Sequence, residues 1–232
     1  MKTLGMIGGT GPESTVEYYR RLVAAYRKRE AEGRAPSIFI NSIDNKKLIA
    51  AFTEQALDVA TDYLVCEIGK LERAGADFAL MSANTPHIVF DEVQRRVGIP
   101  LLSIVTATCD AAVASSVRRP ALFGTRFTMQ SGMFPESFAR RDMTIVVPNE
   151  EEQEFIHDKY MNELFVGLIL DETRAALLQI VEAMKQRDAI DALILGGTEL
   201  SLIFRERLAG GLPVLDTTQI HVDAAVDWLL RE

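Results

Sequence analysis

The sequence predicts an α/β protein built around parallel β-sheets. Short apolar runs alternate along the chain with longer stretches that have the period of an amphipathic helix, which is the pattern of strand-helix-strand units. The two halves of the chain also resemble each other at a nearly constant offset. Together these observations predict two pseudo-symmetric lobes, each a sandwich of a parallel sheet and helices, with a site in the cleft between them.

The expected elements follow from this alternation in chain order. Apolar runs predict strands at residues 4–7, 37–41, 78–81, 101–104, 121–123, 144–147, 192–195 and 214–215. Helical periodicity predicts helices at residues 14–31, 53–74, 88–96, 106–116, 155–167, 173–186 and 220–230. The charged stretch 27–34 is interpreted as a helix end followed by a loop.

Three pairs of segments carry the internal repeat. Residues 6–9 and 122–125 are both strand ends that run into a glycine-containing turn, and residues 77–84 resemble 191–198. A proline, an apolar strand and a later Asp-Ala-Ala-Val segment recur at residues 100–113 and 213–226. We therefore expect one lobe at 1–100 plus 211–232, with the final strand and helix returning to it, and a second lobe at 101–210.

Composition and charge narrow the classes of partner. The formal charge is −8 and no cluster of Lys or Arg reverses it locally, which argues against nucleic acid. No apolar run has the length of a membrane span, and the first residues lead directly into a strand, so we expect no membrane association and a cytoplasmic location. Cys66 and Cys109 are the only thiols and no cluster has metal-ligand spacing, so neither a disulfide framework nor a metal is expected.

Small polar residues follow the predicted strands at equivalent places in the two halves. Loops beyond the carboxyl ends of parallel strands form binding sites, and helix N-termini there attract anions. These loops predict a site for a small carboxylate or phosphate. The candidate binding residues are Gly9, Thr10, Asn84, Thr85, Thr125, Thr128, Gly197 and Thr198.

Four segments in these loops resemble motifs of the aspartate/glutamate racemases, the cofactor-independent amino-acid racemases. They are the turn that begins at Gly8-Gly9-Thr10-Gly11-Pro12, the segment Ala83-Asn84-Thr85-Pro86-His87, the loop Gly124-Thr125-Arg126-Phe127-Thr128 and the segment Gly196-Gly197-Thr198-Glu199. The resemblance covers nearly the whole chain. It implies an amino acid or small carboxylate of the aspartate or glutamate type as ligand, no pyridoxal or other cofactor, and a homodimer.

The resemblance also implies a mechanism that this chain departs from. Racemisation removes the α-proton from one face and returns it from the other, so it needs two acid/base groups. The family places a cysteine at each of the two positions that hold Ala83 and Gly197 here. Neither residue can carry a proton, so the racemase chemistry is expected to be altered or reduced, and return of both cysteines is expected to restore α-proton exchange.

Three interpretations of this loss stay open. In the first, the chain catalyses a one-sided lyase, isomerase or decarboxylase reaction with Glu199, Ser82, His87 or a held water. In the second, it binds a carboxylate without chemistry, as a regulatory protein. In the third, it racemises weakly with substitute groups, or engineered substitutions have inactivated it. Asn84, Thr85, Thr125 and Thr128 also fit a second role as helix caps. His87 also fits a buried, hydrogen-bonded histidine, and Glu199 fits an acidic residue of a first helical turn.

The side-chain specificity of the site is also left open by the sequence. Aspartate-selective relatives often carry a lysine where Phe165 stands here. Asn45, Lys46 and Lys47 are alternative partners for a distal carboxylate. Tyr18, Tyr19 and Phe165 would instead favour an apolar side chain, and His221 is placed near the border of the cleft.

Overall fold

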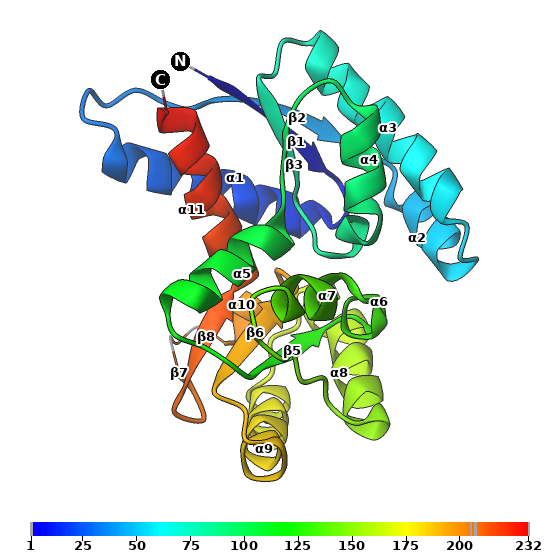
Figure 1. Ribbon diagram of the computed structural model, residues 1–232, viewed down its shortest axis with the longest axis vertical. Coiled ribbons are helices and arrows are strands. Elements are labelled where there is room, and N and C mark those ends of the chain that lie inside the picture. The colour runs from blue at the N-terminus through cyan, green and yellow to red at the C-terminus, as the bar shows by residue number, and fades with distance from the viewer. Residues whose placement is uncertain (1, 205, 207, 232) are drawn as a thin grey trace. The chain divides into compact units, whose positions relative to one another are not determined.

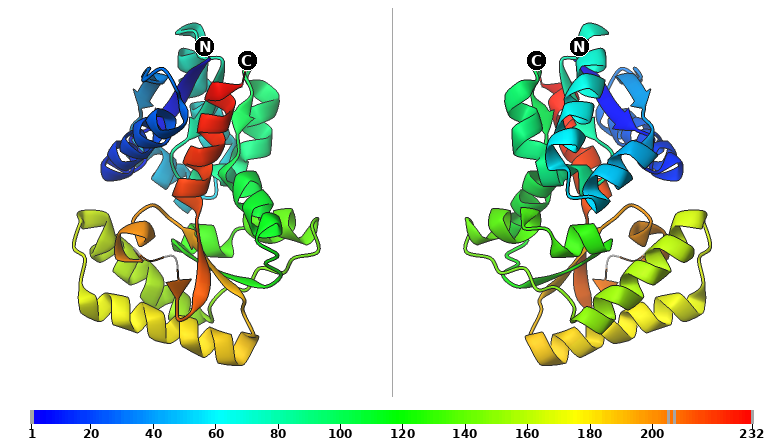
Figure 2. Two further views of the ribbon diagram at one scale, coloured as in Figure 1. Left: turned by 90° about the vertical axis from the view of Figure 1, so that its left-hand side faces the viewer. Right: turned by 90° about the vertical axis from the view of Figure 1, so that its right-hand side faces the viewer.

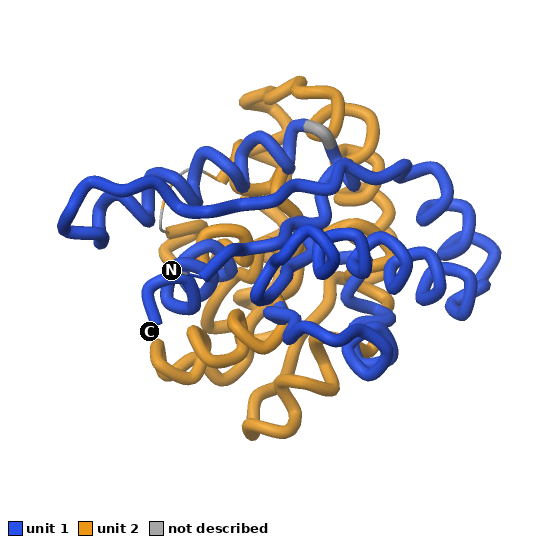
Figure 3. Tube along the Cα trace, turned by 90° about the horizontal axis from the view of Figure 1, so that it is seen from above, with its two compact units in different colours: residues 1–103, 221–232 blue, residues 104–220 orange. Residues whose placement is uncertain are grey.

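The computed structural model describes residues 2–204, 206 and 208–231. The chain divides into two compact units. Unit 1 comprises the residues through Ser103 and those from His221 onward, and unit 2 comprises residues 104–220 (Figure 3). Each unit has its own sheet, its own helices and its own apolar core.

Unit 1 contains a four-stranded parallel sheet in the order β2-β1-β3-β4 (Figure 1). Its strands are β1 (Thr3–Gly8), β2 (Ser37–Ser42), β3 (Phe78–Met81) and β4 (Leu101–Leu102). Its helices are α1 (Pro12–Arg29), α2 (Asn45–Thr53), α3 (Leu57–Arg73), the short 3₁₀-helix η1 (Thr85–Val89) and α4 (Phe90–Arg96), and it also includes most of α11 (Thr217–Leu230).

The two faces of β1 show why unit 1 has helices on both sides of its sheet. Side chains alternate along a strand, so Leu4 and Met6 point to one face and Gly5 to the other. Leu4 and Met6 are buried in the cluster that α1 and α11 complete, whereas a Cβ at Gly5 would meet the Cβ of Leu71 in α3 at 3.1 Å. Burial of both faces explains why β1 is almost entirely apolar.

Unit 2 contains a second four-stranded sheet in the order β5-β6-β8-β7, in which only β7 is antiparallel to its neighbour. Its strands are β5 (Pro120–Gly124), β6 (Ala192–Gly196), β7 (Leu208–Ala209) and β8 (Leu212–Asp216). Its helices are α5 (Ile104–Ala114), α6 (Arg126–Gln130), α7 (Met133–Ala139), α8 (Glu150–Asn162), η2 (Leu164–Val166), α9 (Asp171–Asp188) and α10 (Leu200–Ile203).

Alternation along β6 divides the core of unit 2 into two layers. Leu193 and Leu195 belong to the cluster formed with α8 and α9, and Ile194 belongs to the cluster formed with α5 and α7. Figure 2 shows α8 and α9 as neighbouring helices of this unit that cross at an angle. The sheet is therefore covered on both faces, and its strand ends lead into short loops that contain small residues.

The internal repeat is present in the topology. Strands β1, β3 and β4 are neighbours in that order in the first sheet, and the strands that match them in sequence, β5, β6 and β8, are neighbours in that order in the second. The predicted α/β class with two parallel-sheet units is confirmed. Since β1 lies beside β3 and β5 beside β6, the loops after these pairs emerge at the same edge of each sheet.

Several elements differ from the sequence-based expectations. The predicted strand 144–147 is reduced to a single bridge between Ala121 and Val146, before the chain leaves the sheet at Pro148. The final strand, β8, pairs with β6 in unit 2, so the expectation that it returns to the first lobe is wrong. The sequence predicts no helix at residues 45–52, where most of α2 forms; Asp44 caps this helix by accepting a hydrogen bond from the Lys46 N–H.

Candidate functional site

The first candidate loop, after β1, is held by hydrogen bonds within unit 1. The Gly9 N–H donates to Thr15 Oγ1 at 2.8 Å, and Asn45 Nδ2 donates to the Thr10 carbonyl at 2.8 Å. Gly9 has a φ of +80° and packs against the Ile43 backbone. These contacts fix the turn, and they leave the Thr10 hydroxyl buried without a hydrogen-bond partner in the described part of the chain.

The second candidate loop of unit 1 follows β3. Ser82 is fully buried and its hydroxyl donates to the Ile7 carbonyl at 2.9 Å, so it joins this loop to β1. Asn84 and Thr85 begin η1, and the Asn84 side chain makes no capping hydrogen bond there. The alternative role of Asn84 as a helix cap is therefore wrong. Asn84 is buried, and Ala83 beside it presents only a methyl group.

His87 and His221 form a buried pair beneath this loop. The His87 Nδ1 lies 2.9 Å from the Ala83 carbonyl, and the His221 Nε2 lies 3.0 Å from the Leu102 carbonyl. A carbonyl only accepts, so these nitrogens carry the protons, and the His221 Nδ1 accepts from the Tyr18 hydroxyl at 3.1 Å. Burial lowers the pKa of His87 to about 4 and that of His221 to about 3, the latter also through the neighbouring imidazole of His87. Both rings are neutral structural groups.

In unit 2, Thr125 begins α6 and caps it. Its Oγ1 accepts from the Thr128 N–H at 3.3 Å and lies 3.2 Å from the Thr128 hydroxyl. The expected capping role of Thr125 is confirmed. Thr128 is fully buried, so only Thr125 presents part of its surface to solvent in this pair.

The loop after β6 contains the acidic group of the candidate site. Glu199 is 5% exposed, and its carboxylate accepts hydrogen bonds from the Thr198 hydroxyl at 2.8 Å and from the Tyr160 hydroxyl. Tyr160 comes from α8, and burial together with the charge of Glu199 raises the pKa of its phenol well above the ordinary value. The phenol is therefore a neutral hydrogen-bond donor. Tyr160 lies outside the four sequence motifs, and nothing in the sequence places α8 over this loop.

The ring of Tyr160 also lies against Gly197. A Cβ at Gly197 would be 2.5 Å from Cε2 and 2.8 Å from Cζ of the ring. Gly197 therefore differs from Ala83, the other position at which the sequence lacks an expected thiol. The ring of Tyr160 occupies the volume that a side chain at residue 197 would need.

The proposed specificity residues have other contacts. Phe165 packs against the core of unit 2, Tyr18 is buried in unit 1, and Lys47 lies 5.5 Å from the ring centre of Tyr63. Tyr19 is 48% exposed on α1. Of these groups, only Tyr19 retains a large exposed apolar surface.

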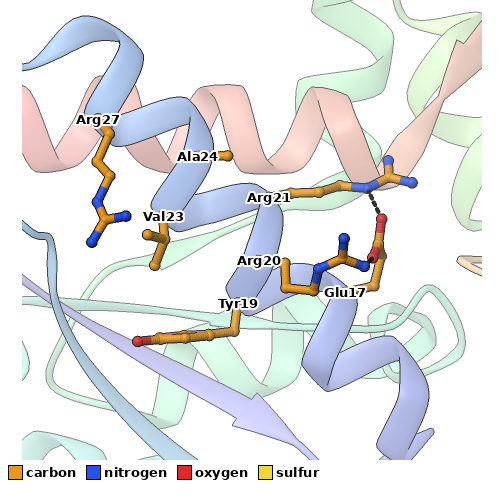
Figure 4. A pocket seen from close by; sticks show the side chains of 7 residues that line it. All are labelled: Glu17, Tyr19, Arg20, Arg21, Val23, Ala24 and Arg27. Atoms are coloured by element: carbon orange, nitrogen blue, oxygen red, sulfur yellow. Dashed lines mark hydrogen bonds and ion pairs between the residues drawn. The ribbon is translucent and has the colours of Figure 1, made fainter.

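A shallow depression of about 420 Å³ lies along α1, beside Tyr19 (Figure 4). Its walls come from this single helix, and Glu17 forms ion pairs with Arg20 and Arg21 across it. Its cations are therefore already paired in part. A hollow of this kind does not supply the converging small polar groups that a carboxylate needs.

Neither a membrane-spanning helix nor a metal centre is found in the part of the chain that the structure describes. Among residues 2–204, 206 and 208–231, every helix is too short or too polar to span a bilayer. Within the same described residues, no group of three or more His, Cys, Asp or Glu side chains is arranged to hold a metal ion.

The fold and loops define a class of α/β protein with two repeated parallel-sheet units, each ending in small polar loops. The chain belongs to the Asp/Glu/hydantoin racemase family, whose sequence profile matches residues 7–225. This confirms the family indicated by the four motifs.

Individual relatives agree with this assignment. The chain is 22% identical over 248 residues to the broad-specificity amino-acid racemase RacX of Bacillus subtilis, with 98% of each chain covered. It matches a crystal structure from Yersinia pestis assigned to the Asp/Glu racemases with a TM-score of 0.90 and 28% identity, and an aspartate racemase homologue from Pyrococcus horikoshii with a TM-score of 0.86 and 31% identity. Both structures are covered over their full length, as is this chain.

Proposed function

We propose that this protein binds an amino acid or another small carboxylate, of the aspartate or glutamate type, and that it does not racemise it by the two-thiol route. The binding groups are the loops after β1 and β3 in unit 1 and after β5 and β6 in unit 2. They are Gly9, Thr10, Asn84, Thr85, Thr125, Thr128, Gly197 and Thr198.

The observation that carries this proposal is the pair of residues at the expected thiol positions. Ala83 offers a methyl group, and Gly197 offers no side chain and has the ring of Tyr160 in its place. General acid/base groups contribute about 10²–10⁴-fold to rate, so the loss of both removes most of a two-base reaction. The family relationship and the RacX similarity support an amino acid as ligand.

A one-sided reaction is the second candidate function. Glu199 supports it, because a carboxylate held by two hydroxyl groups stands two residues after Gly197. Ser82 and His87 are weaker candidates for chemistry. The Ser82 hydroxyl donates to a strand carbonyl, and burial holds His87 neutral through a lowered pKa.

Calorimetry and proton exchange test the proposal together. Titration with L- and D-aspartate, L- and D-glutamate and succinate should give heat of binding for at least one ligand. Incubation of the same amino acids in D₂O, followed by NMR and chiral chromatography, should show no racemisation. Slow deuterium incorporation without inversion would favour the one-sided reaction, and robust racemisation would contradict the proposal.

Thr125 offers a control for the ligand's location. Thr125→Ser keeps the hydroxyl and the cap, whereas Thr125→Ala removes both. Binding that is equal in the two variants would place the carboxylate elsewhere.

A homodimer and a cytoplasmic location are further parts of the proposal. Phe39 and Ile40 on the edge strand β2 are 39% and 44% exposed, and an exposed apolar edge favours association with a second copy. Sedimentation of the native chain beside Ile40→Lys tests the dimer: the variant should sediment as a monomer.

A further inference from the structure

Gly197 is a glycine because of space and not because of its backbone conformation. Its φ lies outside the left-handed region that favours glycine. Its virtual Cβ, however, would lie 2.5 Å from Cε2 and 2.8 Å from Cζ of Tyr160, closer than real Cβ atoms approach other atoms. Any side chain at residue 197 therefore requires the Tyr160 ring to move.

The Tyr160 ring is held at both ends. Its body packs in the cluster that contains Ile156, Leu195 and Leu200, and the residue is 6% exposed. Its hydroxyl donates to the Glu199 carboxylate. Displacement of the ring would break this hydrogen bond and open the core between α8 and the sheet, so the ring is not a flexible neighbour that yields at low cost.

We infer that Tyr160 is a positioning residue of the loop after β6: its ring takes the volume that a cysteine side chain at residue 197 would need, and its hydroxyl fixes Glu199 as the acidic group of that loop. The effect of Tyr160 on catalysis rests on the proposed function, whereas its effect on the packing around residue 197 rests on the structure alone. It revises the expectation that two restored thiols are sufficient. Cysteine at residue 197 also needs a shorter side chain at residue 160.

The catalytic consequence is tested with three combined variants. The double variant, Ala83→Cys with Gly197→Cys, should exchange the α-proton of aspartate or glutamate no faster than the native chain. The triple variant that also carries Tyr160→Leu should exchange it roughly 10²-fold faster, which is the lower end of the contribution of one acid/base group. Addition of Tyr160→Phe is the matched control. It keeps the ring atoms that contact residue 197, so exchange should stay at the level of the double variant. A double variant as active as the one with Tyr160→Leu would overturn the inference.

The structural consequence is tested without any ligand. Gly197→Ala in the native background should lower Tm by roughly 5 °C, as expected for overpacking in a chain of this size, and by less than half as much when Tyr160→Leu is present. Gly69→Ala is the control, since a Cβ there meets only the end of the Arg73 side chain at 3.2 Å. It should not lower Tm in either background.

The two experiments separate the inference from the proposed function. Equal losses of Tm for Gly197→Ala in both backgrounds would overturn the inference, whatever the activity. If the losses differ as expected while no carboxylate binds, the packing relation between Tyr160 and Gly197 holds and the proposed function fails.

Discussion

Lowering the pH from 7 to 5 should destabilise this protein through the buried pair His87 and His221. Both imidazoles are neutral in the folded chain, with pKa values of about 4 and about 3, against 6.5 for an ordinary histidine. Between these values the unfolded chain binds more protons than the folded chain. Protons therefore favour unfolding, and the stability that is present above about pH 6.5 is lost as the pH falls.

The magnitude follows from the same pKa values. Between pH 7 and pH 5, each histidine should contribute a loss of about 2 kcal/mol to the free energy of unfolding, so the pair should account for about 4 kcal/mol. Desolvation is the main cause for both rings. The Tyr18 hydroxyl that donates to His221 is neutral, so it does not offset a positive charge on the ring.

Urea unfolding followed by circular dichroism at pH 7, 6 and 5 measures this loss, above the range in which most carboxylates titrate. His87→Gln and His221→Gln should each remove about half of the pH dependence, even where they lower stability at every pH. His157→Gln is the comparison: His157 is only partly buried on α8, but burial and the neighbouring Arg126 lower its pKa as well, so its variant should remove a smaller share of the pH dependence than either variant of the pair. A constant unfolding midpoint from pH 7 to 5, or an unchanged pH dependence in both variants of the pair, would refute the assignment.

Two further predictions concern the candidate loops. Gly9→Ala should lower Tm by more than Gly75→Ala. Both residues have positive φ, but of the two only Gly9 would bring its Cβ against backbone, at 2.5 Å from the Ile43 carbonyl oxygen. Equal losses of Tm in the two variants would contradict this prediction. Thr125→Ala should cost about 1 kcal/mol through loss of the α6 cap, and Thr125→Ser should cost much less; an alanine variant as stable as the native chain in urea would show that the cap contributes nothing.

The sequence by itself determined the fold class, most of the strands and helices, and the family. These follow from local signals: apolar periodicity distinguishes strand from helix, and glycine or threonine at a strand end sets the turn that follows. The repeat added the division into two similar units, because similar segments form similar units. The sequence also showed that Ala83 and Gly197 cannot carry a proton, since that depends on residue type alone.

Only the tertiary structure decided which side chains meet. Tyr160 reaches Glu199 from 39 residues away, and His221 contacts Tyr18 across 203 residues. Such contacts depend on how α8 packs on its sheet and how α11 packs on α1, which local periodicity does not specify. The sequence likewise does not specify that β8 joins the second sheet, because the edges of both sheets offer the same backbone hydrogen-bonding groups. The sequence therefore shows only that Gly197 lacks a catalytic group, whereas the structure shows that the Tyr160 ring occupies the space beside it.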